Sequence, residues 1–107
     1  MSARHSAPLP AAFALQNYPN PFNAATQIRF DLPQKAEIHL AVFDVAGHEV
    51  QELISGSRAA GSHEVIWNGR NRDGIELSSG IYLVRLRYRA NKSAPWSQLV
   101  RRLMMVK

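Results

Sequence analysis

A chain of 107 residues, 46% hydrophobic and 20% charged, is long enough to form one domain with its own core, and this composition excludes an intrinsically disordered protein. It contains no cysteine, which excludes disulfides and thiolate metal sites, and no apolar run near the roughly 20 residues that span a bilayer, so no transmembrane segment is expected. Its net charge is +5, with the excess at one end: residues 1–76 hold six basic and eight acidic side chains, whereas residues 77–107 hold seven basic and no acidic ones.

The first residues predict no regular structure. Residues 1–14 hold two prolines and five alanines without a usable period, so we expect a linker or a cloning remnant there. Residues 1–8 lack the apolar h-region of a secretory signal peptide, so a signal for export would lie elsewhere. The folded domain is therefore expected at residues 15–107.

A stiff segment opens the domain, with the sequence NYPNPFN at residues 17–23. Pro19 and Pro21 fix φ at about −65° and lack amide donors, which excludes the middle of a sheet. We expect the segment at an edge or end of the fold, with Tyr18 and Phe22 anchored on the core and the asparagine side chains bonded to the exposed backbone around them. A ligand groove is the alternative, but no charged or catalytic residue converges on these aromatics.

Alternation of polar and apolar residues predicts the strands that follow. Strands are expected at residues 26–32, 37–45, 63–67, 80–89 and 96–106. Residues 50–54 are expected to form either a short strand or one helical turn. The residues expected to face the core are Ile28, Phe30, Leu32, Ile38, Leu40, Val42, Val65, Trp67, Tyr82, Val84, Leu86 and Tyr88.

Turn residues separate these strands. Gly47 is available for a positive φ in the turn at 46–49, and the pair Asp73-Gly74 ends a polar loop. No segment shows the helical period of apolar residues. Six or seven short strands at spacings of about 8–12 residues indicate an all-β fold, an antiparallel β-sandwich.

An ordered set of motifs then carries a family resemblance. The motifs are Pro-Asn-Pro-Phe at 19–22, Asp44-x-x-Gly47, Trp67-x-Gly69, Asp73-Gly74, Ser79-Gly80-Ile81-Tyr82 and a basic last strand ending in Lys107. With them, residues 15–107 resemble the type A C-terminal sorting domain of type IX secretion cargo proteins, a family similar to the immunoglobulin-like domain of the flagellar hook-capping protein. The resemblance implies an immunoglobulin-like sandwich of about seven strands. Its structural motif residues would be Tyr18, Pro19, Asn20, Pro21, Phe22, Gly47, Trp67, Gly69, Asp73, Gly74, Gly80 and Tyr82.

The resemblance implies a non-enzymatic address label, with no catalytic residue, cofactor or metal. Domains of this family stand at the end of secreted enzymes and adhesins of Bacteroidetes-type bacteria, which they direct from the periplasm to the cell surface. The implied partners are the outer-membrane translocon, shuttle proteins, a sortase-like peptidase that removes the domain, and anionic lipopolysaccharide. Lys107 is expected to be the C-terminus of a larger cargo protein. Where family members commonly carry a pair of spaced lysines, this sequence has Arg101, Arg102 and Lys107.

A row of arginines is the main candidate for docking. Arg85, Arg87 and Arg89 share one face of their strand at steps of about 7 Å, and Arg101 or Arg102 could extend the row. Two interpretations stand equal: charges that keep an edge soluble, or docking on an acidic partner or a lipopolysaccharide phosphate. Nucleic acid is not expected, because the tyrosines of this strand belong on its buried face and leave no aromatic residue among the arginines.

Other chemistry finds little support. The four histidines lie on different elements without ligand spacing, so no zinc site is expected. An oxygen-rich calcium loop is faintly suggested by Asn71, Asp73 and Glu76. Their spacing does not fit the twelve-residue pattern of such loops, so we interpret the segment as a turn. No nucleophile elbow, P-loop or dinucleotide fingerprint occurs, so an enzyme is not expected. Two alternatives to sorting stay open: a carbohydrate-binding or adhesion module, with Trp96 as its exposed aromatic residue, and a structural spacer.

Overall fold

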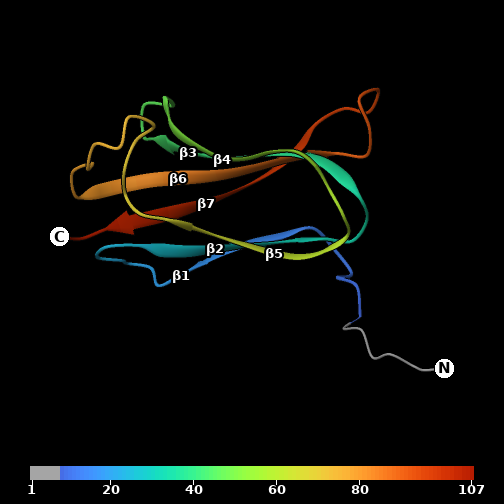
Figure 1. Ribbon diagram of the computed structural model, residues 1–107, viewed down its shortest axis with the longest axis horizontal. Helices are drawn as coiled ribbons and strands as arrows, with labels where there is room; N and C mark the ends of the chain where they lie inside the picture. Colours follow the sequence, from blue (N-terminus) through green and yellow to red (C-terminus); the bar gives the residue numbers. More distant parts are fainter. Residues whose placement is uncertain (1–7) are drawn as a thin grey trace.

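The protein is a sandwich of two stacked antiparallel sheets, seen edge-on in Figure 1, in a computed structural model that describes residues 8–107. One sheet has the strand order β1-β2-β5 and the other β4-β3-β6-β7. The strands are β1 (Ala14–Tyr18), β2 (Thr26–Leu32), β3 (Ala36–Asp44), β4 (Glu49–Arg58), β5 (Gly61–Trp67), β6 (Gly80–Arg89) and β7 (Ser97–Met105). The predicted all-β sandwich of about seven strands is confirmed.

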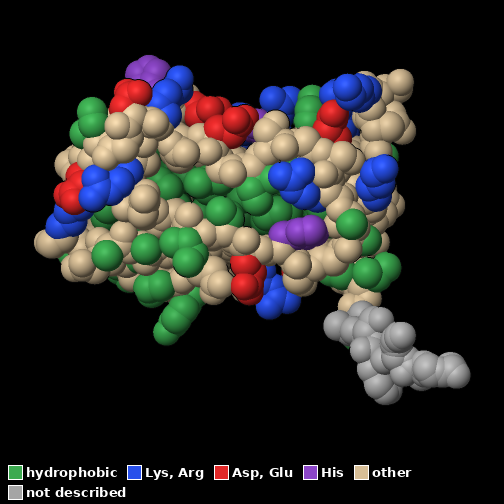
Figure 2. All heavy atoms as spheres, viewed as in Figure 1, with side chains coloured by type: hydrophobic (Ala, Val, Ile, Leu, Met, Phe, Trp, Pro, Cys, Tyr) green, Lys and Arg blue, Asp and Glu red, His purple; other side chains and the backbone are tan. Residues whose placement is uncertain are grey.

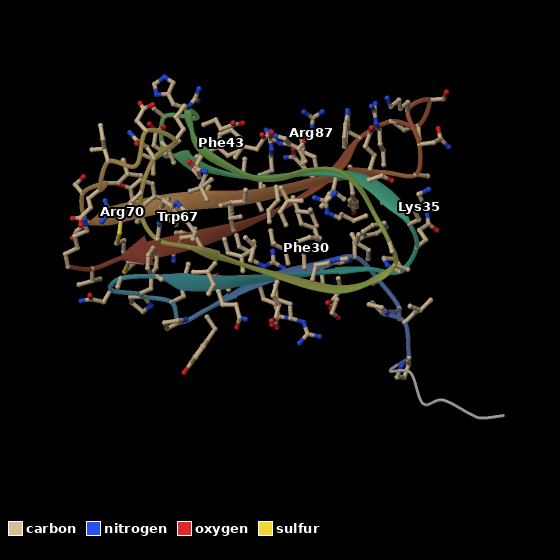
Figure 3. All side chains as sticks on the ribbon, in the orientation of Figure 1. Phe30, Lys35, Phe43, Trp67, Arg70 and Arg87 are labelled. Carbon is tan, nitrogen blue, oxygen red and sulfur yellow. The ribbon has the colours of Figure 1, made fainter. Side chains whose placement is uncertain are left out.

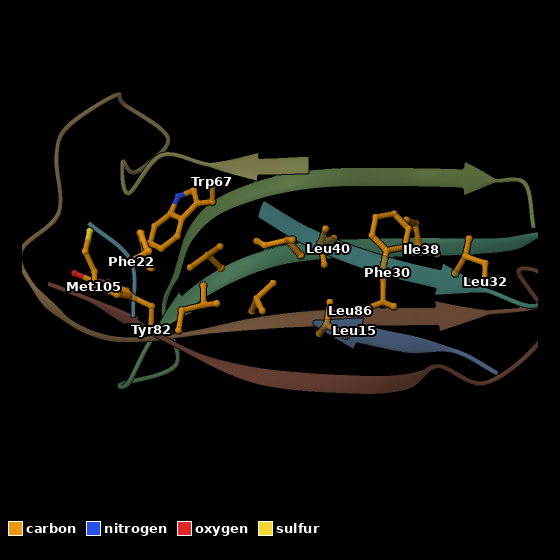
Figure 4. Close-up of a cluster of buried hydrophobic side chains, with 14 of the residues drawn as sticks. Leu15, Phe22, Phe30, Leu32, Ile38, Leu40, Trp67, Tyr82, Leu86 and Met105 are labelled. Atoms are coloured by element: carbon orange, nitrogen blue, oxygen red, sulfur yellow. The ribbon is translucent and has the colours of Figure 1, made fainter. Parts of the chain in front are cut away.

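The core lies between β2 of the smaller sheet and β3 and β6 of the larger one (Figure 4). Strict alternation puts every second residue of these strands inside, and full burial of each such side chain contributes about 1.5–3 kcal/mol. The residues predicted to face the core are buried, apart from Val65 and Tyr88, which are half-buried against it. The predicted bounds of β2 and β6 are those observed.

The strand β4 differs from its prediction. It runs for ten residues, Glu49–Arg58, where residues 50–54 were expected to form a short strand or a helical turn. Its pairing with β3 shifts register twice, at Leu40/Ala41 and at Val42/Phe43. Each shift breaks the alternation of inward and outward side chains, which removes the period that would mark a long strand. Val45, expected to continue β3, follows the end of that strand and is exposed.

The segment before the first proline forms the edge strand β1, paired with β2. Leu15 faces the core and Asn17 is half-buried, so Tyr18, one residue out of phase, points to solvent and is 79% exposed. The prediction that Tyr18 anchors this segment on the core was therefore wrong. The expected linker at 1–14 lies partly outside the described residues; within the described part, Phe13 packs against Tyr88 with ring centroids 3.8 Å apart and the rings tilted by 35°.

The proline segment itself closes one end of the sandwich. Both X-Pro bonds, Tyr18–Pro19 and Asn20–Pro21, are cis. The Thr26 hydroxyl, buried at the start of β2, donates to the Pro19 carbonyl at 2.8 Å. Phe22 is 2% exposed and forms a parallel bridge with Met105: its N–H donates to the carbonyl of Met104, and its carbonyl accepts from the N–H of Val106, both at 2.9 Å. The predicted core anchor at Phe22 is confirmed.

Candidate docking groove

The structure separates the six basic residues predicted to dock. Arg85, Arg87 and Arg89 lie on the outer face of the four-stranded sheet, since the residues in the opposite phase of β6, Tyr82, Val84 and Leu86, face the core. On β7, Arg102 pairs with Leu83 and shares this outer face, whereas Arg101 pairs with Val84 and is out of phase with it. Lys107 lies elsewhere, with its Nζ 3.5 Å from Glu76 Oε1. The row of three is thus extended by Arg102 alone.

A groove of about 420 Å³ runs across this outer face, and we call it the arginine groove. Its lining includes Arg85, Arg87 and Arg89 of β6, His39 of β3, Glu49 of β4, and Trp96 just before β7. Figure 3 shows Arg87 and Phe43 on the outer side of the four-stranded sheet and Phe30 between the sheets.

Aromatic rings hold all three arginines. The Arg85 guanidinium carbon lies 4.4 Å from the centroid of the Phe43 ring, and those of Arg87 and Arg89 lie 4.7 and 4.1 Å from the Trp96 ring. Such contacts favour a cation by about 0.5–2 kcal/mol each and hold the planar group in place. The expectation that no aromatic residue lies among the arginines was therefore wrong.

The missed rings come from other elements than β6. Phe43 stands beside Leu83 on the adjacent strand β3, and Trp96 immediately precedes β7. Only the pairing of β6 with both neighbours brings these rings to the row. Because two guanidinium groups stack on Trp96 and leave it half-buried, its ring is not the freely exposed platform that the carbohydrate alternative requires.

The arginines differ in their ionic partners. Arg89 Nε lies 2.5 Å from Glu37 Oε1, and both side chains are mostly buried. Among residues 8–107, Arg85 and Arg87 form no salt bridge with a carboxylate. The Nε of Arg85 is buried and has no hydrogen-bond partner there. Burial lowers the pKa of Arg85, repulsion by Arg87 lowers it further and Glu49 opposes both, but the guanidinium of arginine stays charged.

Glu49 lines the opposite side of the groove, and Glu52 lies next to it. The Nε2 of His39 lies 3.0 Å from Glu52 Oε2 and 3.6 Å from Glu49 Oε1, so both acids of β4 point to the outer face. Glu52 pairs with Ala41, which pairs in turn with Arg85, so acid and base stand in one row across three strands. Figure 2 shows acidic and basic side chains side by side along the upper margin of the molecule, above this sheet. The groove therefore has an acidic side and a basic side.

The structural motif residues gather at the end of the sandwich, apart from the groove. Trp67 packs against Phe22 and Tyr82, with ring centroids 5.7 and 5.5 Å apart, and its Nε1 donates to the Arg70 carbonyl at 3.0 Å. The Tyr82 hydroxyl donates to the Ser78 carbonyl at 2.7 Å. Positive φ angles occur at Gly47, Gly69, Gly74 and Gly80, and Asp73 lies in the turn before Gly74.

A second hollow, of about 400 Å³, lies at this end near Asn23, Met105 and Lys107. Its two cations, Arg70 and Lys107, already share a partner, since both contact Glu76, at 3.1 and 3.5 Å. In the part of the chain that the structure covers, no three His, Asp or Glu side chains group as metal ligands. That part also holds no helix long and apolar enough to cross a membrane. The arginine groove is thus the best candidate for recognition.

Residues 18–92 of the chain match the family described as FlgD Ig-like domain. The chain belongs to the FlgD Ig-like domain family. A comparison with curated protein sequences found no match.

Solved structures share the immunoglobulin-like fold of this FlgD Ig-like domain. Dimeric latent PorU from Porphyromonas gingivalis aligns with 86% of the chain at a TM-score of 0.70 and 15% identity. FlgD from P. aeruginosa aligns with 76% of the chain at a TM-score of 0.59 and 21% identity. PorZ of P. gingivalis, an essential bacterial surface component of its type-IX secretion system, aligns with 87% of the chain at a TM-score of 0.55 and 22% identity. The chain spans 9% of PorU, 66% of that FlgD and 11% of PorZ. Identities this low show the fold alone.

Proposed function

We propose that this FlgD Ig-like domain is a non-catalytic sorting domain, which directs a larger secreted protein through the type IX secretion system to the bacterial cell surface. The observation that carries the proposal is the ordered set of motifs, from Pro-Asn-Pro-Phe at 19–22 to the basic last strand, within one immunoglobulin-like sandwich. The fold shared with PorZ, a surface component of that system, supports it.

The fold of the domain suits such a role. The chain before β1 and the end of β7 leave the sandwich in opposite directions in Figure 1, so a cargo joined before β1 does not cover the C-terminal end. The cationic hairpin β6–β7 displays Arg85, Arg87 and Arg102 on the outer face, where a partner can reach them. We propose the translocon, its shuttle proteins and a sortase-like peptidase as partners, with lipopolysaccharide as the anchor of the cargo.

A reporter fusion tests this role. Residues 8–107 are joined behind a signal peptide and an unrelated reporter, in a host with a type IX system; residues 8–14 are kept because Phe13 packs on Tyr88. We expect the reporter at the cell surface. The matched control is the Ig-like domain of P. aeruginosa FlgD in the same fusion, which shares the fold and is expected to stay in the periplasm. A reporter that stays in the periplasm on a folded, protease-resistant domain would overturn the proposal.

The family match favours one second candidate, a structural spacer of the hook-capping kind. A spacer of that kind would self-associate, whereas a sorting domain would act as a single copy on its cargo. Light scattering of the isolated chain separates the two. Stable oligomers, together with no export in the fusion assay, would favour the spacer.

A further inference from the structure

The arginine groove holds two cations that form no salt bridge among residues 8–107, Arg85 and Arg87. Their guanidinium carbons lie over the rings of Phe43 and Trp96, at 4.4 and 4.7 Å from the ring centroids. A guanidinium edge matches a carboxylate or phosphate with two parallel hydrogen bonds. The Nε of Arg85 is buried, so this arginine meets a ligand through the terminal amino groups of its guanidinium. The groove is therefore built to receive an oxyanion.

The opposite side of the groove limits which oxyanion can enter. Glu49 and Glu52 lie on β4, and β6 lies two strands away, so the backbones that carry the acids and the arginines are about 10 Å apart across the sheet. Glu37 adds a further carboxylate beside Arg89. A polyanion lying across this face would bring its next charges against these carboxylates, and like charges at this range repel.

We propose that the arginine groove docks a protein segment of mixed charge. An Asp or Glu side chain of the partner binds Arg85 and Arg87, and a Lys or Arg side chain nearby in the same segment binds Glu49 and Glu52. Charge complementarity with the two sides of the groove selects this occupant over lipopolysaccharide and nucleic acid, whose charges have one sign. The partner rests on the proposed function, since a sorting domain must be recognised by a protein.

Matched peptides test the charge preference on the isolated chain. The mixed peptide is Ac-Gly-Thr-Glu-Thr-Lys-Thr-Gly-NH₂, whose two charges lie about 7 Å apart on one side of an extended strand, so the lysine stem covers the remaining distance. The acidic peptide replaces its Lys by Glu. Binding is followed by NMR through the Nε–H signals of Arg85 and Arg87 and the indole N–H of Trp96. We expect saturable shifts at these three groups and at least fivefold weaker binding of the acidic peptide.

Four variants locate the interaction. Arg87→Gln is expected to weaken the mixed peptide at least tenfold, whereas Arg101→Gln, out of phase on the neighbouring strand, changes nothing. The double variant Glu49→Gln/Glu52→Gln is expected to abolish the preference, so that the two peptides bind equally. Arg85 is partly buried, so it is replaced by lysine and not by an uncharged residue. Arg85→Lys keeps the positive charge but lacks the guanidinium group that forms two parallel hydrogen bonds, and it is expected to weaken binding of the mixed peptide several-fold.

Several outcomes would overturn the groove as a protein site. One is that the acidic peptide, heparin or lipopolysaccharide binds as tightly as the mixed peptide. Another is that the NMR shifts caused by the mixed peptide centre on Arg101 or Lys107. The third is that a domain carrying Arg87→Gln exports the reporter at the wild-type level. A wild-type domain that fails to export the reporter, while the mixed peptide still binds the groove, would instead overturn only the sorting role. The two proposals can therefore fail separately.

Discussion

The side-chain amide of Asn20 pairs with the backbone of Met104 and Arg102, in the manner of a short strand. Its Oδ1 accepts from the N–H of Met104 at 2.9 Å, and its Nδ2 donates to the carbonyl of Arg102 at 2.9 Å. Met104 and Arg102 lie 84 and 82 positions after Asn20 in the chain. One asparagine thus satisfies two backbone groups on the last strand.

The first prediction follows from this pair of hydrogen bonds. Asn20→Ala should lower the free energy of unfolding by about 1–2 kcal/mol, because both bonds are lost and the groups left behind are partly open to water. Asn23→Ala is the control, since Asn23 makes no side-chain hydrogen bond to the described residues, and should change stability by less than about 0.5 kcal/mol. Urea denaturation measures both. Equal losses in the two variants would refute the role assigned to Asn20.

The second prediction compares two tyrosines of the family motif. Tyr82 is 7% exposed and donates to the Ser78 carbonyl, whereas Tyr18 is 79% exposed. Tyr82→Phe should cost about 0.5–1.5 kcal/mol, because it removes the hydrogen bond that this buried side chain donates, and Tyr18→Phe should cost nothing measurable. Thermal denaturation of both variants is the measurement. A larger loss at Tyr18 would mean that its ring packs on the core after all.

The third prediction compares two glycines with nearly the same backbone. Gly69 and Gly74 have φ of 74° and 78°, so alanine is strained at either position by about 1–2 kcal/mol. A Cβ at Gly69 would also lie 2.9 Å from Met105 Sδ in the core, whereas one at Gly74 meets nothing within 4 Å. Gly69→Ala should therefore cost about 1–3 kcal/mol more than Gly74→Ala in urea denaturation. Equal costs would show that the Met105 side chain moves aside freely.

The fourth prediction concerns acid. Hydrogen bonding from the His48 backbone is the main cause that lowers the pKa of Asp44 from 3.8, and its N–H lies 2.9 Å from Asp44 Oδ1. A lowered folded-state pKa means that the ionised carboxylate stabilises the fold above pH 3.8, and that this contribution is lost as pH falls through the lowered value. Asp44→Asn keeps an acceptor oxygen but not the charge. The wild type should unfold at a higher urea concentration than Asp44→Asn at neutral pH, and at the same concentration in strong acid. A difference that persists in strong acid would contradict the assignment.

Local alternation was sufficient to predict the central strands. In β2 and β6 one face meets the core along the whole strand, so the period of two appears in the residues themselves, as with Ile28, Phe30 and Leu32. It was insufficient for β4, because bulges in the pairing with β3 decide which of its residues face inward. Tyr18 was misplaced for a related reason: the phase of β1 is set by Leu15, outside the motif.

The groove could be predicted only in part. Three arginines on one face of β6 follow from spacing within a single strand. Their aromatic supports, Phe43 and Trp96, depend on which strands pair with β6 and in what register, and no local pattern holds that information. The acids of β4 needed both the register and its bulges. A site assembled across four strands therefore becomes visible only in three dimensions.

The parallel bridge between Phe22 and Met105 has a mechanical consequence. The segments around Phe22 and Met105 run side by side in the same direction. If the N-terminal side of the first segment and the C-terminal side of the second are pulled apart, the force acts along both segments, as shear. The two hydrogen bonds of Phe22, to Met104 and Val106, would then carry the load together, and the buried ring would have to slide past Trp67 before they parted. Tension on the two ends of the domain would therefore load this bridge in shear once β1 has parted from β2.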